Sequence, residues 1–132
     1  MPTIPAGAIG GVITGWGLAL PDRIVTNDEL SQTMDTSDEW IRERTGIHRR
    51  HVGGTTASLS IESGKQALQM ANIDPANIDA LILSTTTPDR QVPGTSATVA
   101  HGLGLSCGAF DINAACSGFV YGLVVAHGLI AM

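Results

Sequence analysis

The chain has 132 residues and a net charge of −5; apolar residues make up 43% of it and aromatic residues only 4%. This length fits one domain with a hydrophobic core, and no apolar run reaches the roughly 20 residues that a membrane span needs. The acidic balance argues against general nucleic-acid binding, and the N-terminal residues lack the order of a signal peptide. We therefore expect a cytoplasmic protein that binds neither nucleic acid nor membrane.

The first part of the chain predicts a strand followed by two short helices. Residues 8–17 are apolar and β-branched, which favours a strand. Residues 25–34 predict a helix, with Asn27 as its capping residue. Thr36 has a glutamate three positions later, the spacing of a capping box, and a second helix is expected from there to Gly46.

The rest of the chain alternates between helices and strands. An amphipathic period begins near residue 57, and Asp74 followed by proline predicts a short turn after it. We expect, in order, a helix over 57–72, a strand over 79–87, a helix over 95–104, a strand over 109–113 and a helix over 115–131. This order predicts an α/β fold with a mixed, mainly parallel sheet and helices on both faces.

The last predicted helix is apolar nearly all round. A helix without a polar face is expected to lie buried between layers of the fold. The sequence stops inside or just after this helix. We therefore expect that the element covering it is missing or comes from another chain, and that the sequence is incomplete.

A local group of cations stands out on this acidic chain. Four of its seven lysines and arginines, Arg42, Arg44, Arg49 and Arg50, fall within one short stretch. Such a patch suits a small anionic ligand better than a polyanion. An alternative explanation is a solvated helix end, with cations near the negative pole of the helix dipole.

The two cysteines have to be interpreted singly. Cys107 and Cys116 form no disulfide framework, and neither has the spacing of a zinc site, so no metal is expected. Cys116 follows the predicted strand 109–113 and opens the apolar helix, where the helix dipole favours a thiolate and small neighbours allow a substrate to approach backbone amides. A small buried structural thiol is the alternative explanation. We take Cys107 as structural.

A base that activates the thiol is not evident in the sequence. His127 returns to nearly the same face of the predicted helix as Cys116, but about 16 Å further along its axis at 1.5 Å per residue. The remaining histidines lie far from Cys116 in the sequence. We expect the catalytic histidine to come from residues that this chain lacks; the alternative is that a contact in the fold brings one of these histidines to Cys116.

Three separated segments resemble β-ketoacyl-acyl-carrier-protein synthase III of the thiolase superfamily. They are DTSDEWIRERTGI (35–47), STTTPDRQVPGTSA (84–97) and FDINAACSGFVYGL (110–123), in that order along the chain. The resemblance runs from about residue 8 to the end. It implies a thiolase-like fold in which residues 1–132 are a truncated N-terminal domain, with the C-terminal half absent.

The resemblance also implies an activity and its substrates. An acyl-CoA transfers its acyl group to Cys116, and malonyl-acyl-carrier protein then loses CO₂ to attack the thioester, which initiates fatty acid synthesis in a homodimer. Cys116 is the nucleophile by this analogy, and its own N–H forms part of the oxyanion hole. Trp40 matches the residue that stacks on the CoA adenine, Arg44 matches a cation at the nucleotide end, and Thr36 belongs to the same motif. No cofactor is implied beyond the CoA thioester.

The resemblance limits what the chain is expected to do alone. The family's histidine and asparagine for decarboxylation come from the second half, so we expect no complete condensation from residues 1–132. The loop that contains Val92 matches a segment that closes the partner subunit's acyl pocket, and a small side chain there suits a longer or branched acyl group. Two alternatives stay open: a secondary-metabolism relative with another acceptor, and a non-catalytic remnant.

Overall fold

The computed structural model describes residues 10–132, so residues 8 and 9 of the predicted first strand lie outside the described part. Two compact units divide the chain. One unit contains Ala19–Thr55, and the other combines residues 10–18 with Thr56–Met132.

The unit of residues 19–55 contains two short strands and two helices. Strand β1 (Ile24–Thr26) pairs antiparallel with β2 (Arg49–His51), and helices α1 (Asn27–Ser31) and α2 (Asp38–Thr45) lie between them in the sequence. The predicted helix over 25–34 was wrong at both ends, because its first residues belong to β1 and the helix ends at Ser31. Pairing with β2 supplies hydrogen bonds for these residues that the local helix pattern did not anticipate.

Caps of α1 and α2 also differ from the prediction, each by one residue. Thr26, not Asn27, caps α1 by accepting a hydrogen bond from Glu29 N at 3.2 Å. Ser37, not Thr36, caps α2 by accepting from Trp40 N at 3.1 Å. The predicted end of α2 is confirmed, since Gly46 adopts the left-handed conformation with φ 70°.

Asn27 is buried because it links three parts of this unit. Its side-chain amide donates to Asp38 Oδ1 and to Ile47 O, both at 2.8 Å, and its Oδ1 accepts from Arg50 at 2.9 Å. It is 1% exposed. A buried amide with all these partners joins α1, α2 and β2, which explains why it does not serve as a cap.

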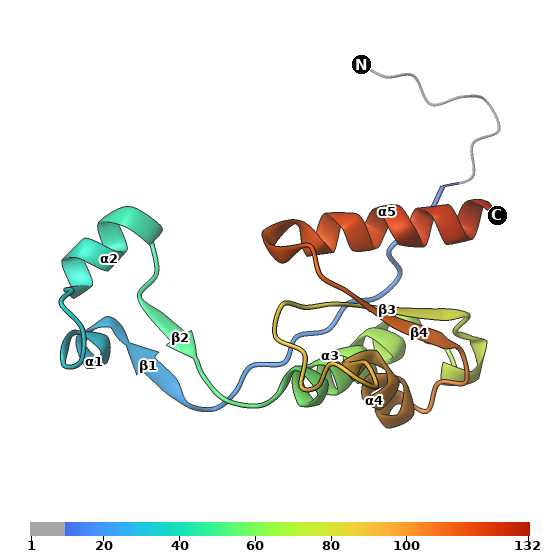
Figure 1. The fold of residues 1–132 in the computed structure, drawn as a ribbon, viewed down its shortest axis with the longest axis horizontal. Coiled ribbons are helices and arrows are strands. Elements are labelled where there is room, and N and C mark those ends of the chain that lie inside the picture. The colour runs from blue at the N-terminus through green and yellow to red at the C-terminus, as the bar shows by residue number, and fades with distance from the viewer. Residues whose placement is uncertain (1–9) are drawn as a thin grey trace, which may run out of the picture. The chain divides into compact units, whose positions relative to one another are not determined.

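The other unit is built on two parallel strands. Strands β3 (Ala80–Ser84) and β4 (Gly108–Ile112) pair in register, from Ala80 opposite Gly108 to Ser84 opposite Ile112. Figure 1 shows α3 (Thr56–Ala71) and α4 (Thr95–Leu103) on one side of this pair and α5 (Gly118–Ala131) on the other. Short 3₁₀ turns, η1 (Pro75–Asn77) and η2 (Ala115–Ser117), precede β3 and α5. This arrangement confirms the predicted parallel pairing with helices on both faces.

The core of this unit lies where α3, α4 and β3 meet. Val99 of α4 is 1% exposed and forms the buried cluster with Ala57 and Leu83. Small residues let the two helices approach closely, because a Cβ added to Gly102 would overlap Ile61 and one added to Gly64 would lie 2.8 Å from Leu103. The small-residue composition of the chain therefore serves close helix packing.

Residues 10–17 are irregular, so the predicted strand over 8–17 is wrong in the described part. The first residues of this segment lie beside α5, where a Cβ added to Gly11 would be 3.3 Å from Ile130, and its later residues run along α3. Leu18 N donates to Gln66 Oε1 at 3.1 Å, and a Cβ added to Gly15 or Gly17 would overlap backbone oxygens of α3. Strand propensity produces a strand only where a neighbouring edge pairs with the backbone, and a helix offers no such edge.

Helix α5 is largely exposed, so the burial between layers expected for it is not provided by the described residues themselves. Phe119 is 69% exposed and Val124 is 61% exposed, while Gly118 at its first position is buried. Within residues 10–132, α5 contacts β3 and leaves apolar side chains open to solvent. No helix among these residues is long and apolar enough to cross a membrane.

Candidate functional site

Cys116 lies on a tight turn at the carboxyl end of β4. The strand ends at Ile112, Ala115 N donates to Asn113 Oδ1 at 3.4 Å, and Ser117 N donates to Ala114 O at 3.0 Å. Ala115 has φ 47°, a left-handed conformation that residues with a side chain rarely adopt. This turn reverses the chain immediately before Cys116, which is exposed.

The predicted position of Cys116 at the carboxyl edge of a parallel strand pair is confirmed, but its place in the apolar helix is not. Cys116 belongs to η2, and α5 begins two residues later at Gly118. A turn of this kind presents the side chain to solvent, whereas a position inside the helix would share the helix's packing. The alternative of a buried thiol is therefore wrong for Cys116. Cys107, which is half-buried before β4, is also a free cysteine.

The loop after β3 is fixed to the amino ends of α3 and α4. The carboxylate of Asp89 accepts from Thr56 N at 2.8 Å and from Ala57 N at 3.1 Å. Asp89 N in turn donates to Thr95 Oγ1 at 2.9 Å. Val92, which lies between these two anchors, is 88% exposed. The Val92 side chain is therefore exposed to solvent, while charge-assisted hydrogen bonds to Asp89 hold the loop in place.

A second carboxylate caps α4 from the neighbouring strand. Asp111 of β4 accepts from Thr95 N at 2.9 Å and from Ser96 N at 2.7 Å. Burial raises the pKa of Asp111, but the hydrogen bonds from Ser96 and Thr95 outweigh that effect and hold its pKa below the ordinary value. Gly94 precedes the helix and supplies no side-chain cap of its own.

Trp40 and Arg44 form an exposed pair on α2, in the unit of residues 19–55. The guanidinium carbon of Arg44 lies 4.4 Å from the centroid of the Trp40 ring, a cation–π contact between residues one helical turn apart. Trp40 is 51% exposed. Thr36, the third residue expected in this motif, has a buried Oγ1 without a hydrogen-bond partner. The structure thus brings Trp40 and Arg44 together, and Cys116 and Val92 belong to the other unit.

The four arginines near α2 do not form one uniform patch. Arg42 pairs with Asp38 at 3.3 Å, and Arg50 is tied to Asn27. The hydrogen bond from Asn27, together with the neighbouring Arg42, lowers the pKa of Asp38. Arg42 and Arg44 also lie in the last turn of α2, as the helix-end explanation predicts. Arg44, stacked on Trp40, is the member of this group best placed to meet an anionic ligand beside an aromatic ring.

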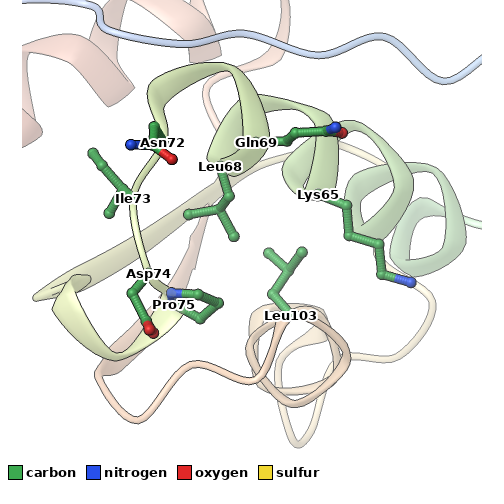
Figure 2. Close-up of a pocket in the computed structure, with 8 residues that line it drawn as sticks. All are labelled: Lys65, Leu68, Gln69, Asn72, Ile73, Asp74, Pro75 and Leu103. Carbon is green, nitrogen blue, oxygen red and sulfur yellow. The ribbon is translucent and has the colours of Figure 1, made fainter.

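Two other kinds of site are possible in the described residues, a metal-binding cluster and a pocket. Among residues 10–132, no group of three or more His, Cys, Asp or Glu side chains is arranged to hold a metal ion. A pocket of about 550 Å³ lies between the end of α3, the turn after it and α4. Figure 2 shows Leu68 and Leu103 pointing toward one another there, with Lys65 directed away. This pocket includes none of the predicted site residues.

Sequence reasoning missed Asp89 and Asp111. Both carboxylates act on helices that begin well away from them in the sequence, over 32 residues for Asp89 to Ala57 and 16 for Asp111 to Thr95. Local capping patterns are searched within one helical turn, so they carry no signal for such pairs.

Comparison with known proteins identifies the fold. A sequence profile described as 3-oxoacyl-[acyl-carrier-protein (ACP)] synthase III matches residues 110–132. The crystal structure of 3-oxoacyl-[acyl-carrier-protein] synthase III from Aquifex aeolicus superposes with a TM-score of 0.87 at 42% identity, over 89% of this chain and 39% of that chain. A priming β-ketosynthase from the R1128 polyketide pathway superposes with a TM-score of 0.86 at 36% identity, over 90% of this chain and 37% of that chain. The chain therefore has a thiolase-like fold, matched over part of these structures.

Sequence comparison shows which proteins the chain is similar to. Over 122 residues the chain is 52% identical to a β-ketoacyl-[acyl-carrier-protein] synthase III from Roseiflexus castenholzii, covering 89% of this chain and 37% of the relative. It is 54% identical to β-ketoacyl-[acyl-carrier-protein] synthase III 3 from Streptomyces coelicolor, covering 91% of this chain and 37% of the relative. The chain is a homologue of β-ketoacyl-acyl-carrier-protein synthase III and spans a little over a third of the length of these relatives.

Proposed function

We propose that the protein takes an acyl group from acyl-CoA onto Cys116, as the first half of a decarboxylating condensation with malonyl-acyl-carrier protein. The observation that carries this proposal is the exposed position of Cys116 on a turn at the carboxyl end of β4, in a chain 52% identical to a curated synthase III. Ligand clefts of parallel α/β sheets form at this edge. A histidine and an asparagine for the condensing half are assigned by the family resemblance to residues outside this sequence.

The acyl-transfer step needs a thiolate and a place for negative charge. The Cys116 thiolate attacks the thioester carbonyl, the bond to the CoA sulfur breaks, and the departing CoA thiolate takes up a proton. The N–H of Cys116 is proposed to donate to the oxyanion that forms in between. The left-handed conformation of Ala115 supports this role, because it turns the backbone of the next residue away from the strand direction.

Mass measurement of the intact chain tests the proposal directly. After incubation with acetyl-CoA, we expect a covalent acetyl adduct on the parent chain and none on Cys116→Ala. Cys107→Ala is the matched control and keeps the adduct, because Cys107 lies in the loop before β4. A folded parent chain without an adduct would refute the proposal and favour a non-catalytic remnant.

Trp40 and Arg44 are proposed to bind the nucleotide end of CoA, with Thr36 in the same motif. An exposed ring one helical turn from a guanidinium offers a stacking surface beside a positive charge. Replacing Arg44 with alanine is expected to weaken CoA binding by about tenfold, the loss of one charge-assisted contact. Arg42→Ala serves as the control. It removes the same charge from the same helix, and Arg42 is held by Asp38 at 3.3 Å, a shorter contact than the 3.9 Å between Arg44 and Glu43. Equal weakening by both variants would contradict the assignment.

Val92 is proposed to close the acyl pocket of the partner subunit in a homodimer. Its 88% exposure on an anchored loop supports a role outside its own unit. Val92→Phe is therefore expected to shift adduct formation toward acetyl-CoA when acetyl-CoA and a branched acyl-CoA compete. An unchanged ratio would overturn this role while leaving the assignment of Cys116 intact.

A second candidate function is the priming of polyketide or related synthesis, favoured by the likeness to the R1128 priming β-ketosynthase. The two functions share the cysteine and CoA steps and differ in the acyl group or the acceptor. Offering the acylated protein malonyl-acyl-carrier proteins from fatty-acid and polyketide systems distinguishes them by which one yields product.

A further inference from the structure

The turn that carries Cys116 lies between two points that both touch Ser84, the last residue of β3. Gly118, the first residue of α5, is buried, and a Cβ added to it would overlap Ser84 Oγ. Gly118 has ordinary helical angles, φ −54° and ψ −41°. The demand for glycine here is therefore one of space, because the backbone conformation itself would accept any residue.

The other end of the turn lies beside Ser84 and is held by a hydrogen bond from the next residue, Thr85. Ser84 stands opposite Ile112 in the parallel register, and Thr85 N donates to Ile112 O at 3.1 Å. Between Ile112 and Gly118, Ala115 reverses the chain with φ 47°. Since one residue contacts both the strand before the turn and the helix after it, Ser84 defines how far the turn stands from the edge of β3.

We propose that Ser84 and Gly118 are positioning residues for Cys116: their contact sets the place of the cysteine turn at the carboxyl edge of β3. This inference rests on the proposed function in taking Cys116 as the nucleophile, but neither residue is given a part in bond making. A Cβ at position 118 overlaps the Ser84 hydroxyl, so either that hydroxyl rotates away or the start of α5, and the turn joined to it, moves away from β3; the second outcome is the one expected. Removing the Ser84 hydroxyl relieves the overlap, because Ser84 Cβ lies 3.4 Å from that added Cβ, an ordinary contact.

The test compares the reactivity of Cys116 in four variants of the whole chain. Acyl transfer from acetyl-CoA and alkylation by iodoacetamide are followed by peptide mass spectrometry, with Cys107 as the internal reference. The variants are Gly118→Ala, Ser84→Ala, the two combined, and Gly122→Ala as the matched control. Gly122 lies in the same helix, and a Cβ added there would meet Ile112 Cδ1 at an ordinary 3.7 Å.

We expect Gly118→Ala to slow acylation of Cys116 by about tenfold and to change its alkylation rate by about threefold or more, as a misplaced nucleophile does. Adding Ser84→Ala is expected to restore both rates to within about twofold of the Ser84→Ala background. Gly122→Ala and the rate at Cys107 stay at parent values. A general loss of stability in α5 would not be rescued by a smaller residue at position 84 of β3.

Two results overturn the inference: parent-like rates in Gly118→Ala, or no rescue by Ser84→Ala. If the parent chain takes no acyl group, the proposed function fails, and the alkylation rates alone still decide the positioning role. If Gly118→Ala unfolds, both cysteines react like those of an unstructured peptide. Recovery of folding on adding Ser84→Ala then supports the contact, and continued unfolding refutes it.

Discussion

Removing the carboxylate of Asp111 is expected to destabilise the chain more than most single substitutions. Its two oxygens accept from Thr95 N at 2.9 Å and Ser96 N at 2.7 Å, both residues being buried. Loss of a helix cap costs roughly 0.5–2 kcal/mol, and hydrogen bonds to a charged group lie at the upper end of the usual range. We therefore expect Asp111→Ala to lower the free energy of unfolding by about 2–3 kcal/mol. Urea unfolding followed by far-UV circular dichroism measures this change.

A substitution at Gly94 tests separately whether the Asp111 carboxylate caps α4. A Cβ on Gly94 would lie 3.1 Å from Asp111 Oδ1, so Gly94→Ala presses on the carboxylate that caps α4. We expect Gly94→Ala to cost about 1 kcal/mol in the parent and much less when Asp111 is already alanine, because the atoms it presses on are then gone. Equal costs in both backgrounds, or a cost for Asp111→Ala below about 0.5 kcal/mol, would refute the account of this cap.

The same cap predicts a pH dependence whose sign is fixed by the lowered pKa of Asp111. A carboxyl group with a folded-state pKa below its ordinary value of 3.8 stabilises the protein above about pH 4. That stability is lost as the pH falls through the folded-state pKa. The difference in unfolding free energy between parent and Asp111→Asn should therefore shrink on acidification below about pH 4 and stay constant above pH 5. A difference that grows on acidification would contradict it.

Three further substitutions probe other parts of the described chain by the same unfolding measurement. Asp89→Ala removes the acceptor of Thr56 N and Ala57 N and is expected to cost about 1–2 kcal/mol; a neutral result would mean that the amino end of α3 finds another acceptor. Gly46→Ala is expected to cost about 1 kcal/mol because of its φ of 70°, and Gly46→Asn less, since asparagine tolerates this conformation. Val99→Ala, at a 1% exposed position, is expected to cost about 2 kcal/mol, and a cost near zero would mean that the core cluster collapses around the smaller side chain.

Elements with a local signal were predicted from the sequence nearly to their ends. Helix α3 was expected over 57–72 and runs from Thr56 to Ala71, and the proline turn after Asp74 forms as predicted. Apolar periodicity, capping residues and proline all act within one or two turns of the chain. The local sequence therefore predicts where these elements lie, although Asp89, 32 residues from Ala57, caps the start of α3.

Elements that depend on a distant partner were not predictable in this way. Strand β2 consists of Arg49, Arg50 and His51, which show no strand pattern and become a strand by pairing with β1. Residues 10–17 have the strand pattern but lie along α5 and α3. In both cases the neighbour that meets the backbone decides the conformation, and the neighbour is a property of the fold rather than of the segment.

The apolar composition of α5 indicates that the helix is suited to apolar surroundings. It did not predict how exposed its side chains are within residues 10–132. A helix with no polar face is suited to contact on all sides, and β3 supplies contact on one side within residues 10–132. Composition states what surroundings a helix is adapted to. It does not state which elements provide them, so exposed side chains such as Phe119 do not contradict the composition argument itself.

The candidate site shows the same division between local and distant causes. Position in the sequence was enough to place Cys116 at the carboxyl edge of the sheet, because it falls between a strand and an apolar helix; its role as the nucleophile came from the family resemblance. The contacts that hold its turn and the nearby helix ends were not predictable, since they come from Ser84 on β3 and from the carboxylates of Asp89 and Asp111, which cap α3 and α4. This edge is where the polar contacts of the unit gather, while its body is packed through glycine and small apolar residues. The turn that carries Cys116 is held by contacts between residues distant in the sequence. Substitutions at Ser84 or Gly118 therefore test the site better than substitutions next to the cysteine.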